Sequence, residues 1–209
     1  MKNTTLLTPA VAMLLVSLGG AQGQNLVSNG SFEQPARSTP DSWGYTLPDD
    51  WIQNADANHA PAIFNGSVPG WPAPEEGSQF LDIGNTAGFN AGVHQTFTVT
   101  VPGTYDLTWF DNAAIGFPHA YSVSLGGTTV DIPGETGSAT WTEHELLLTL
   151  SGSVTLTFTP IPGGVDTLLD NVQVQSPNPP VPDCAGTFGL LNLALGGIAL
   201  LARKSQRHG

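Results

Sequence analysis

Apolar and polar residues alternate along most of the stretch from Gln79 to Val174. Successive side chains of a β-strand point to opposite faces, so a period of two predicts strands with one buried face. The longer expected strands cover residues 79–84, 93–101, 105–109, 121–125, 128–132, 146–150, 154–158 and 168–174. Shorter strands are expected at 26–27, 50–54 and 62–64, and no part of this stretch has a helical period.

Glycine pairs and proline mark the expected turns between these strands. They are Asn29-Gly30, Pro102-Gly103, Gly126-Gly127 and Ser151-Gly152-Ser153. About nine or ten short strands, with a turn signal every 8–12 residues, are typical of an antiparallel β-sandwich. The sequence therefore predicts an all-β domain over residues 24–175.

Both ends of the chain have a different character. Residues 1–23 combine Lys2, an apolar run and a small-residue site before Gln24, which predicts a helical, cleaved secretory signal peptide. Cleavage after Ala21 is the alternative, and the run is too short to favour a membrane anchor. Residues 176–180 form a Pro-rich, extended linker.

The last segment, 181–209, has the layout of a surface-sorting tail. Val181-Pro182-Asp183-Cys184 precedes an apolar run, which three basic residues follow: Arg203, Lys204 and Arg207. Such a run predicts a short transmembrane helix whose basic end stays cytoplasmic until cleavage. Cys184 is the only cysteine, so the domain contains no internal disulfide.

Charge narrows the possible partners. All 17 acidic residues lie between Glu33 and Asp183, and Arg37 is the only basic residue in that stretch. This surface repels phosphate backbones, which argues against nucleic-acid binding. Carboxylates are also ligands for calcium.

The domain resembles the galactose-binding-like jelly rolls, most closely the bacterial "choice-of-anchor C" surface domains and a related plant cell-wall domain of unknown function. The segments that carry this resemblance are 25–33, 74–85, 93–97, 102–108 and 169–174. The first and last of them also resemble motifs of carbohydrate-binding modules. The tail resembles exosortase-type sorting signals, although Cys184 and Ala185 stand where Val-Pro-Asp-Ser-Gly signals carry Ser and Gly. The resemblance implies cleavage by an exosortase-type processing enzyme and release to the envelope or matrix.

Two kinds of ligand site are candidates. A jelly roll brings its first and last strands together, which would place Glu33 near Asp170, and related carbohydrate-binding modules carry a structural calcium in this region. The alternative is that turn amides or water satisfy both carboxylates. For a sugar site, the loop aromatics Trp43, Tyr45 and Trp71 could stack on saccharide rings, or they could simply cover the ends of the sandwich.

The remaining tryptophans, Trp51, Trp109 and Trp141, are expected to pack in the core or across strands. Catalysis has little support, because the acidic pairs Asp49-Asp50, Glu75-Glu76 and Glu143/Glu145 show no fixed separation and the histidines lack metal-ligand spacing. The sequence thus favours an exported, non-catalytic surface or matrix protein that associates with polysaccharide. A structural protein without a ligand is the alternative, and a glycan hydrolase is a more distant one.

Overall fold

The computed structural model describes residues 24–84, 90–162 and 165–176, which belong to a compact unit, Gly23–Pro179. The predicted signal peptide, nearly all of the linker and the sorting tail with Val181, Pro182, Asp183 and Cys184 lie outside the described residues. Within the described ranges, no helix has the length and apolar character needed to cross a membrane.

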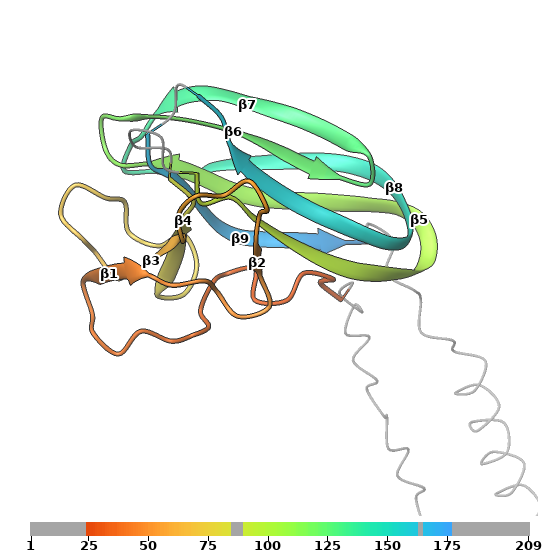
Figure 1. Ribbon diagram of the computed structural model, residues 1–209, viewed down its shortest axis with the longest axis horizontal. Coiled ribbons are helices and arrows are strands. Elements are labelled where there is room, and N and C mark those ends of the chain that lie inside the picture. The colour runs from red at the N-terminus through yellow and green to blue at the C-terminus, as the bar shows by residue number, and fades with distance from the viewer. Residues whose placement is uncertain (1–23, 85–89, 163–164, 177–209) are drawn as a thin grey trace, which may run out of the picture. The chain divides into compact units, whose positions relative to one another are not determined.

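The described residues fold as nine antiparallel strands (Figure 1). They are β1 (Ser42–Tyr45), β2 (Ile52–Gln53), β3 (Ala62–Asn65), β4 (Gln79–Asp82), β5 (Val93–Ala113), β6 (Pro118–Leu125), β7 (Thr128–Thr136), β8 (Thr142–Pro160) and β9 (Thr167–Gln175). The hydrogen-bonded order is β1-β3-β4-β9-β5-β8-β6-β7, with β2 paired to β5. The all-β antiparallel prediction is confirmed.

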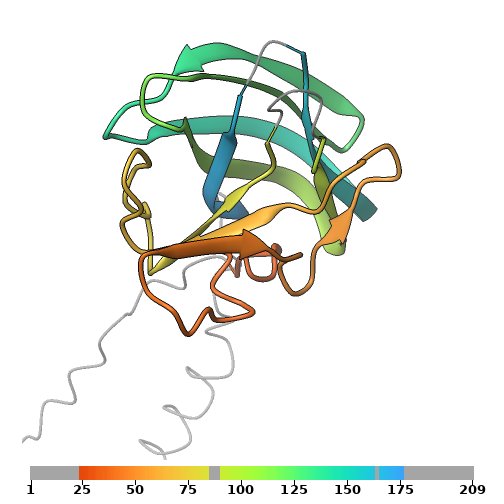
Figure 2. The same ribbon diagram turned by 60° about the vertical axis from the view of Figure 1, so that its left-hand side comes forward.

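The strands form two layers. Figure 2 shows β1, β3 and β4, in orange and yellow, on one side and the green and cyan strands β5 to β8 on the other. The main core lies between them and contains Trp51 and Trp109, as predicted. Alternation places Ile63 of β3 and Leu81 of β4 in this core.

Two predicted turns are wrong. Pro102-Gly103 and Ser151-Gly152-Ser153 do not reverse the chain, because both lie within the long paired strands β5 and β8. The register between these strands shifts there, with Val99 opposite Gly152 and Gly103 opposite Leu150. A β-bulge of this kind bends a strand without ending it, and proline and glycine suit a bulge as well as a turn. By contrast, Gly126-Gly127 does close the predicted β6–β7 hairpin.

The beginning of the domain lies against its last strand, as the jelly-roll prediction requires. The Leu26 N–H donates to the Val174 carbonyl at 2.9 Å, and the Val172 N–H donates to Gly30 at 2.9 Å. Leu26-Val27 does not form a regular strand, however. The Asn25 side chain takes part in this pairing instead, accepting from the Val174 N–H at 2.9 Å.

Candidate functional site

The outer face of β1, β3 and β4 carries an exposed pair of aromatic residues. Trp43 and Tyr45 are two residues apart on the edge strand β1, so both side chains point to the same face. They are 49% and 57% exposed, and their rings meet edge-on with centroids 5.5 Å apart. Together the two exposed rings form an apolar surface on the edge strand, called the platform below, that a ligand can contact.

A second layer of aromatic rings supports this platform. Trp43 stacks on the buried Phe64 at 5.8 Å, and the half-buried Trp71 packs against the same ring at 4.3 Å. Phe64 in turn stacks on Phe80 at 5.0 Å. The structure therefore brings Trp43, Tyr45 and Trp71 to one face. Trp43 and Tyr45 are open to solvent there, whereas Trp71 helps to cover a small second core.

Trp141 belongs to this second core as well. Its ring meets Phe80 edge-on at 5.5 Å, and its Nε1–H donates to the Ala73 carbonyl at 2.7 Å. Trp141 precedes β8 and does not lie within a strand. Its packing role is thus as predicted, although its position in a strand is not.

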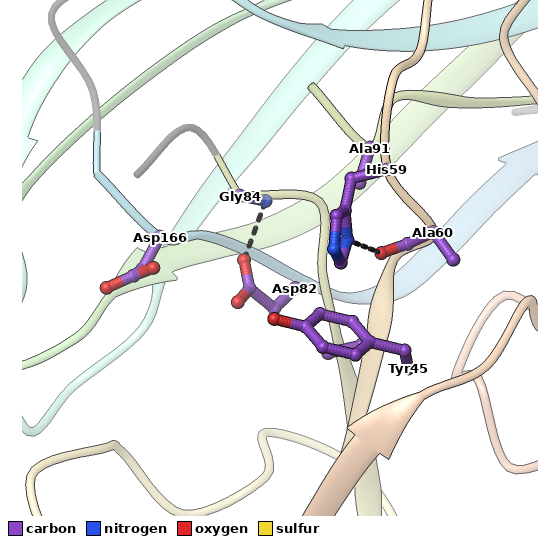
Figure 3. Close-up of a pocket in the computed structure, with 8 residues that line it drawn as sticks. Tyr45, His59, Ala60, Asp82, Gly84, Ala91 and Asp166 are labelled. Carbon is purple, nitrogen blue, oxygen red and sulfur yellow. Dashed lines mark hydrogen bonds between the residues drawn. The ribbon is translucent and has the colours of Figure 1, made fainter. Parts of the chain in front are cut away.

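A pocket of about 200 Å³ opens beside Tyr45 (Figure 3). Its position follows from strand register, since Tyr45 lies opposite Ala62 and Ala62 lies opposite Asp82 across three strands. The residues that line this Tyr45 pocket are Tyr45, His59, Ala60, Ala62, Asp82, Gly84, Ala91 and Asp166. Three of these residues are alanines, and the polar ones come from four segments of the chain.

His59 is fixed at the rim of the Tyr45 pocket. Its ring meets the Tyr45 ring edge-on, with centroids 4.3 Å apart. Its Nδ1 lies 3.0 Å from the Ala60 carbonyl oxygen, which can only accept, so Nδ1 carries a proton. Figure 3 shows the hydroxyl end of Tyr45 directed toward Asp82. The two rings and the carboxylate thus converge on one space.

Asp82 is one of the two carboxyl groups that line the Tyr45 pocket. Its Oδ1 accepts the Gly84 N–H at 2.7 Å, a turn in which Gly84 adopts a φ of 51°. Asp82 keeps some exposed surface as a residue, but protein atoms surround its carboxylate. That burial and the negative charge of Asp166 raise the pKa of Asp82 to about 8, against the opposing effect of the Gly84 N–H.

The proposed calcium ligands Glu33 and Asp170 both anchor the loop that precedes β4. Glu33 Oε1 accepts the N–H groups of Ser78 and Gln79, both at 2.7 Å. Asp170 Oδ2 accepts those of Glu75 and Glu76, at 2.9 and 3.1 Å. A Cβ on Gly77 (φ 64°) would lie 2.4 Å from Glu33 Oε1, so the loop needs glycine there. The two carboxylates therefore hold the two ends of one short loop.

The calcium prediction involves these same two carboxylates. The two oxygens concerned each accept two amide hydrogens, and a cation would compete for the same lone pairs. No group of three or more His, Cys, Asp or Glu side chains is placed to hold a metal within the described ranges. Burial raises the pKa of Asp170 to about 8, although three backbone N–H groups oppose this. Calcium thus stays a prediction, and the contacts match its alternative, satisfaction by turn amides.

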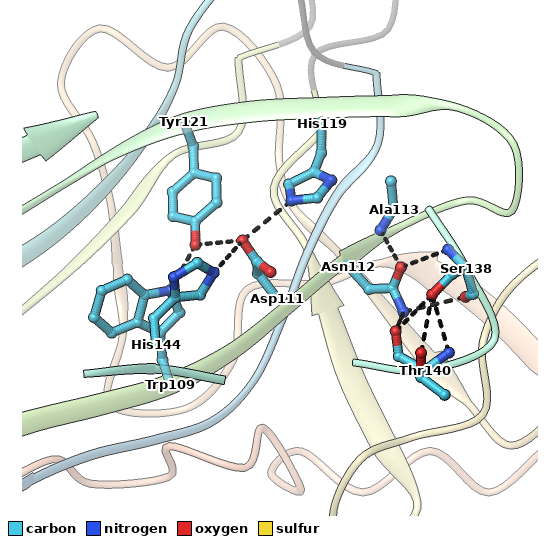
Figure 4. A network of polar contacts seen from close by, with 9 residues as sticks. All are labelled: Trp109, Asp111, Asn112, Ala113, His119, Tyr121, Ser138, Thr140 and His144. Atoms are coloured by element: carbon cyan, nitrogen blue, oxygen red, sulfur yellow. Dashed lines mark hydrogen bonds and ion pairs between the residues drawn. The ribbon is translucent and has the colours of Figure 1, made fainter. Parts of the chain in front are cut away.

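A polar network that the sequence did not reveal lies in the main core around Asp111 (Figure 4). Asp111 Oδ2 lies 3.1 Å from His119 Nε2 and 3.0 Å from His144 Nε2. The Tyr121 hydroxyl donates to the same oxygen at 2.8 Å and accepts the Trp109 Nε1–H at 2.5 Å. Burial would raise the pKa of Asp111, but the two histidines outweigh it and lower that pKa to about 2.

Comparison with known proteins supports the fold of this chain and does not show its function. No protein-family model matches the chain, and no curated protein does. Solved structures do match. The Stig cyclase Fisc from Fischerella sp. TAU has a TM-score of 0.55 at 16% identity, covering 72% of this chain and 95% of that one. An apo cyclase from Fischerella sp. has a TM-score of 0.54 at 14% identity, with 72% and 94% covered.

A carbohydrate-binding module is also among the structural matches. TmCBM61, solved in complex with β-1,4-galactotriose, has a TM-score of 0.47 at 16% identity, covering 73% of this chain and 99% of that one. The two cyclases, with TM-scores above 0.5, share the fold of this chain, and at such identities a shared fold leaves function to the individual site.

Proposed function

We propose that this protein is a non-catalytic, carbohydrate-binding protein of the bacterial cell surface or matrix. A saccharide lies over the Trp43–Tyr45 platform and extends into the Tyr45 pocket. The single observation that carries this function is the exposed pair of aromatic rings, in edge-on contact, directly beside a polar pocket.

The chemistry of the face suits a sugar. A pyranose ring has an apolar face of C–H groups and a rim of hydroxyls, so it needs an aromatic surface and nearby hydrogen-bonding groups. Trp43 and Tyr45 supply the surface, and Phe64 beneath Trp43 restricts its movement. Asp82 and the Tyr45 hydroxyl supply acceptor and donor groups at the edge of the platform.

The tail supplies the location in this proposal. The exosortase-type motif at Val181 to Cys184 and the predicted membrane segment after it would hold the protein at the inner membrane until cleavage. Mass spectrometry of protein recovered from the envelope or medium should find chains that end near Asp183. An intact C-terminus in the membrane fraction would contradict this location.

A glycan array tests the binding function. The purified protein should retain at least one polysaccharide class, and Trp43→Ala should lose most of that retention. Leu147→Ala is the control, because Leu147 is 62% exposed on β8, outside the platform and the pocket. Absence of retention on every glycan would favour the structural alternative.

The same glycans should show no released products after incubation. Asp82 and Asp166 are two interacting carboxyls with a raised pKa at one of them, a combination that glycoside hydrolases also use. Product release that disappears in Asp82→Asn would replace the binding function by hydrolysis.

A further inference from the structure

We propose that the Tyr45 pocket selects a sugar residue with a free ammonium group, as in an unacetylated amino sugar, over neutral and acidic sugars. This inference rests on the proposed function and adds the chemical class of its ligand.

Two carboxyl groups line the Tyr45 pocket, those of Asp82 and Asp166. Among the described residues that line it, none is Lys or Arg. Arg37, the only basic residue between 24 and 176, lies on the other face of β1. Its Nη1 is 2.9 Å from the position of a Cβ on Gly44, which points away from the Trp43 and Tyr45 side chains. A ligand in the pocket therefore meets no fixed cation.

The two carboxylates are close enough to interact. The charge of Asp166 makes ionisation of Asp82 harder, as the raised pKa of Asp82 records. An ammonium group between or beside them would remove this repulsion and favour the ionised form of both. A uronate or sulfate group in the same place would add a third negative charge in a partly desolvated site, which costs binding free energy.

The aromatic rings provide an independent reason for a cation. Tyr45 and His59 meet edge-on at 4.3 Å and both line the pocket, so aromatic rings lie beside its two carboxyl groups. Ammonium groups are attracted to the faces of aromatic rings, most strongly where water is excluded. An aromatic surface joined to carboxylates is thus suited to an ammonium-bearing sugar, and a carboxylate cluster alone would not be.

Titration calorimetry with three defined oligosaccharides tests the selection. The probes are a β-1,4-linked glucosamine oligomer, its fully N-acetylated counterpart and an oligogalacturonate of equal length. The purified full-length protein should bind the glucosamine oligomer at least tenfold more tightly than the acetylated one, and the uronate not measurably. Added salt should weaken the first interaction more than the second, because only the first contains an ion pair.

Substitutions in the Tyr45 pocket test whether the preference for the glucosamine oligomer arises there. Asp82→Asn and Asp166→Asn should each bring the glucosamine and acetylated oligomers to similar affinity. Asp131→Asn removes an exposed carboxylate on β7 and should leave the preference intact. Circular dichroism of each variant checks that the fold is retained.

The outcomes separate this inference from the proposed function. Equal affinity for the two oligomers, with loss of both in Tyr45→Ala, would overturn ammonium selection and leave carbohydrate binding in place. Tighter binding of the oligogalacturonate would likewise overturn ammonium selection and leave carbohydrate binding in place. Absence of binding to these probes and to every glycan of the array would overturn both proposals. An unchanged preference in Asp82→Asn and Asp166→Asn would overturn the assignment of the ammonium to this pocket.

Discussion

Two aspartates on opposite layers of the sandwich show how differently the same side chain is used. Asp111, on β5, is only 1% exposed, and three side chains meet one of its oxygens, which lowers its pKa to about 2. Asp82, on β4, accepts the Gly84 N–H, but burial and the nearby Asp166 carboxylate outweigh this hydrogen bond and raise its pKa to about 8. Burial raises both pKa values, so the difference comes from their partners.

The comparison separates structure from function. Asp111 is charged and contacts His119, His144 and Tyr121 within the main core. Its role is therefore structural, because it holds these side chains together. Asp82 lacks such a partner cation and faces a pocket beside exposed aromatic rings. Groups with raised pKa values in clefts are candidates for ligand sites. Asp111 instead pairs with two histidines through Oδ2, while its Oδ1 is buried with no hydrogen-bond partner among the described residues.

Removal of Asp111 should have the largest effect on stability. Asp111→Ala leaves His119 Nε2 and the Tyr121 hydroxyl without their acceptor in the core, and breaking such a network costs about 3–5 kcal/mol. Urea unfolding of this variant and of the control Asp131→Ala measures the difference. A loss below about 1 kcal/mol would contradict a structural role for the network.

Removal of the loop anchors should come next. Asp170→Ala and Glu33→Ala each leave amide N–H groups of the loop before β4 unpaired, at about 1–3 kcal/mol per variant. If amides alone satisfy these carboxylates, a chelator should leave the melting temperature of the wild type unchanged. A rise in melting temperature with calcium that disappears in Asp170→Ala would instead establish the calcium prediction.

Neutralising Asp82 should stabilise the protein, whereas the preceding variants should destabilise it. Because its folded pKa lies above the ordinary value near 3.8, the protein loses stability as pH rises from about 4 through 8. Asp82→Asn should reduce this loss, with a gain on the order of 1 kcal/mol or less at pH 8 after allowance for solvent screening. Asp170 contributes a similar dependence, so part of the loss should remain.

Urea unfolding at several pH values measures this change. Asp111 acts in the reverse direction, since its lowered pKa gives stability that is lost as pH falls from about 4 toward 2. Equal pH profiles for wild type and Asp82→Asn would show that folding does not raise the pKa of Asp82.

Sequence periodicity was sufficient for most of the fold. Alternation placed most strand residues and the core position of Trp109 correctly, because inward-facing residues of a sandwich are mostly apolar. It failed at Pro102-Gly103 and Ser151-Gly152. Proline and glycine are common both in turns and in β-bulges, so the sequence does not distinguish two separate turns from one shared bulge. Only the register between β5 and β8 distinguishes them.

The site was predictable in part. Trp43 and Tyr45 were predicted as exposed aromatics because they lie in a Pro-rich stretch that reads as loops, but the structure places both on the strand β1. Asp82, His59 and Asp166 were missed, since they come from three distant segments that only the strand register and loops bring together. Asp111 did carry a signal, because it continues the inward alternation of Tyr105, Leu107 and Trp109, where an acid requires buried partners.

The affinity of Tyr45→Ala for the glycan retained best on the array tests the central claim, saccharide binding on this face, most directly. We expect about tenfold weaker binding than the wild type, equivalent to about 1.4 kcal/mol, with the unfolding free energy within about 0.5 kcal/mol of wild type, because Tyr45 is exposed. Leu147→Ala should bind as the wild type does. Unchanged affinity in Tyr45→Ala, or an equal loss in Leu147→Ala, would contradict a binding site at Trp43 and Tyr45.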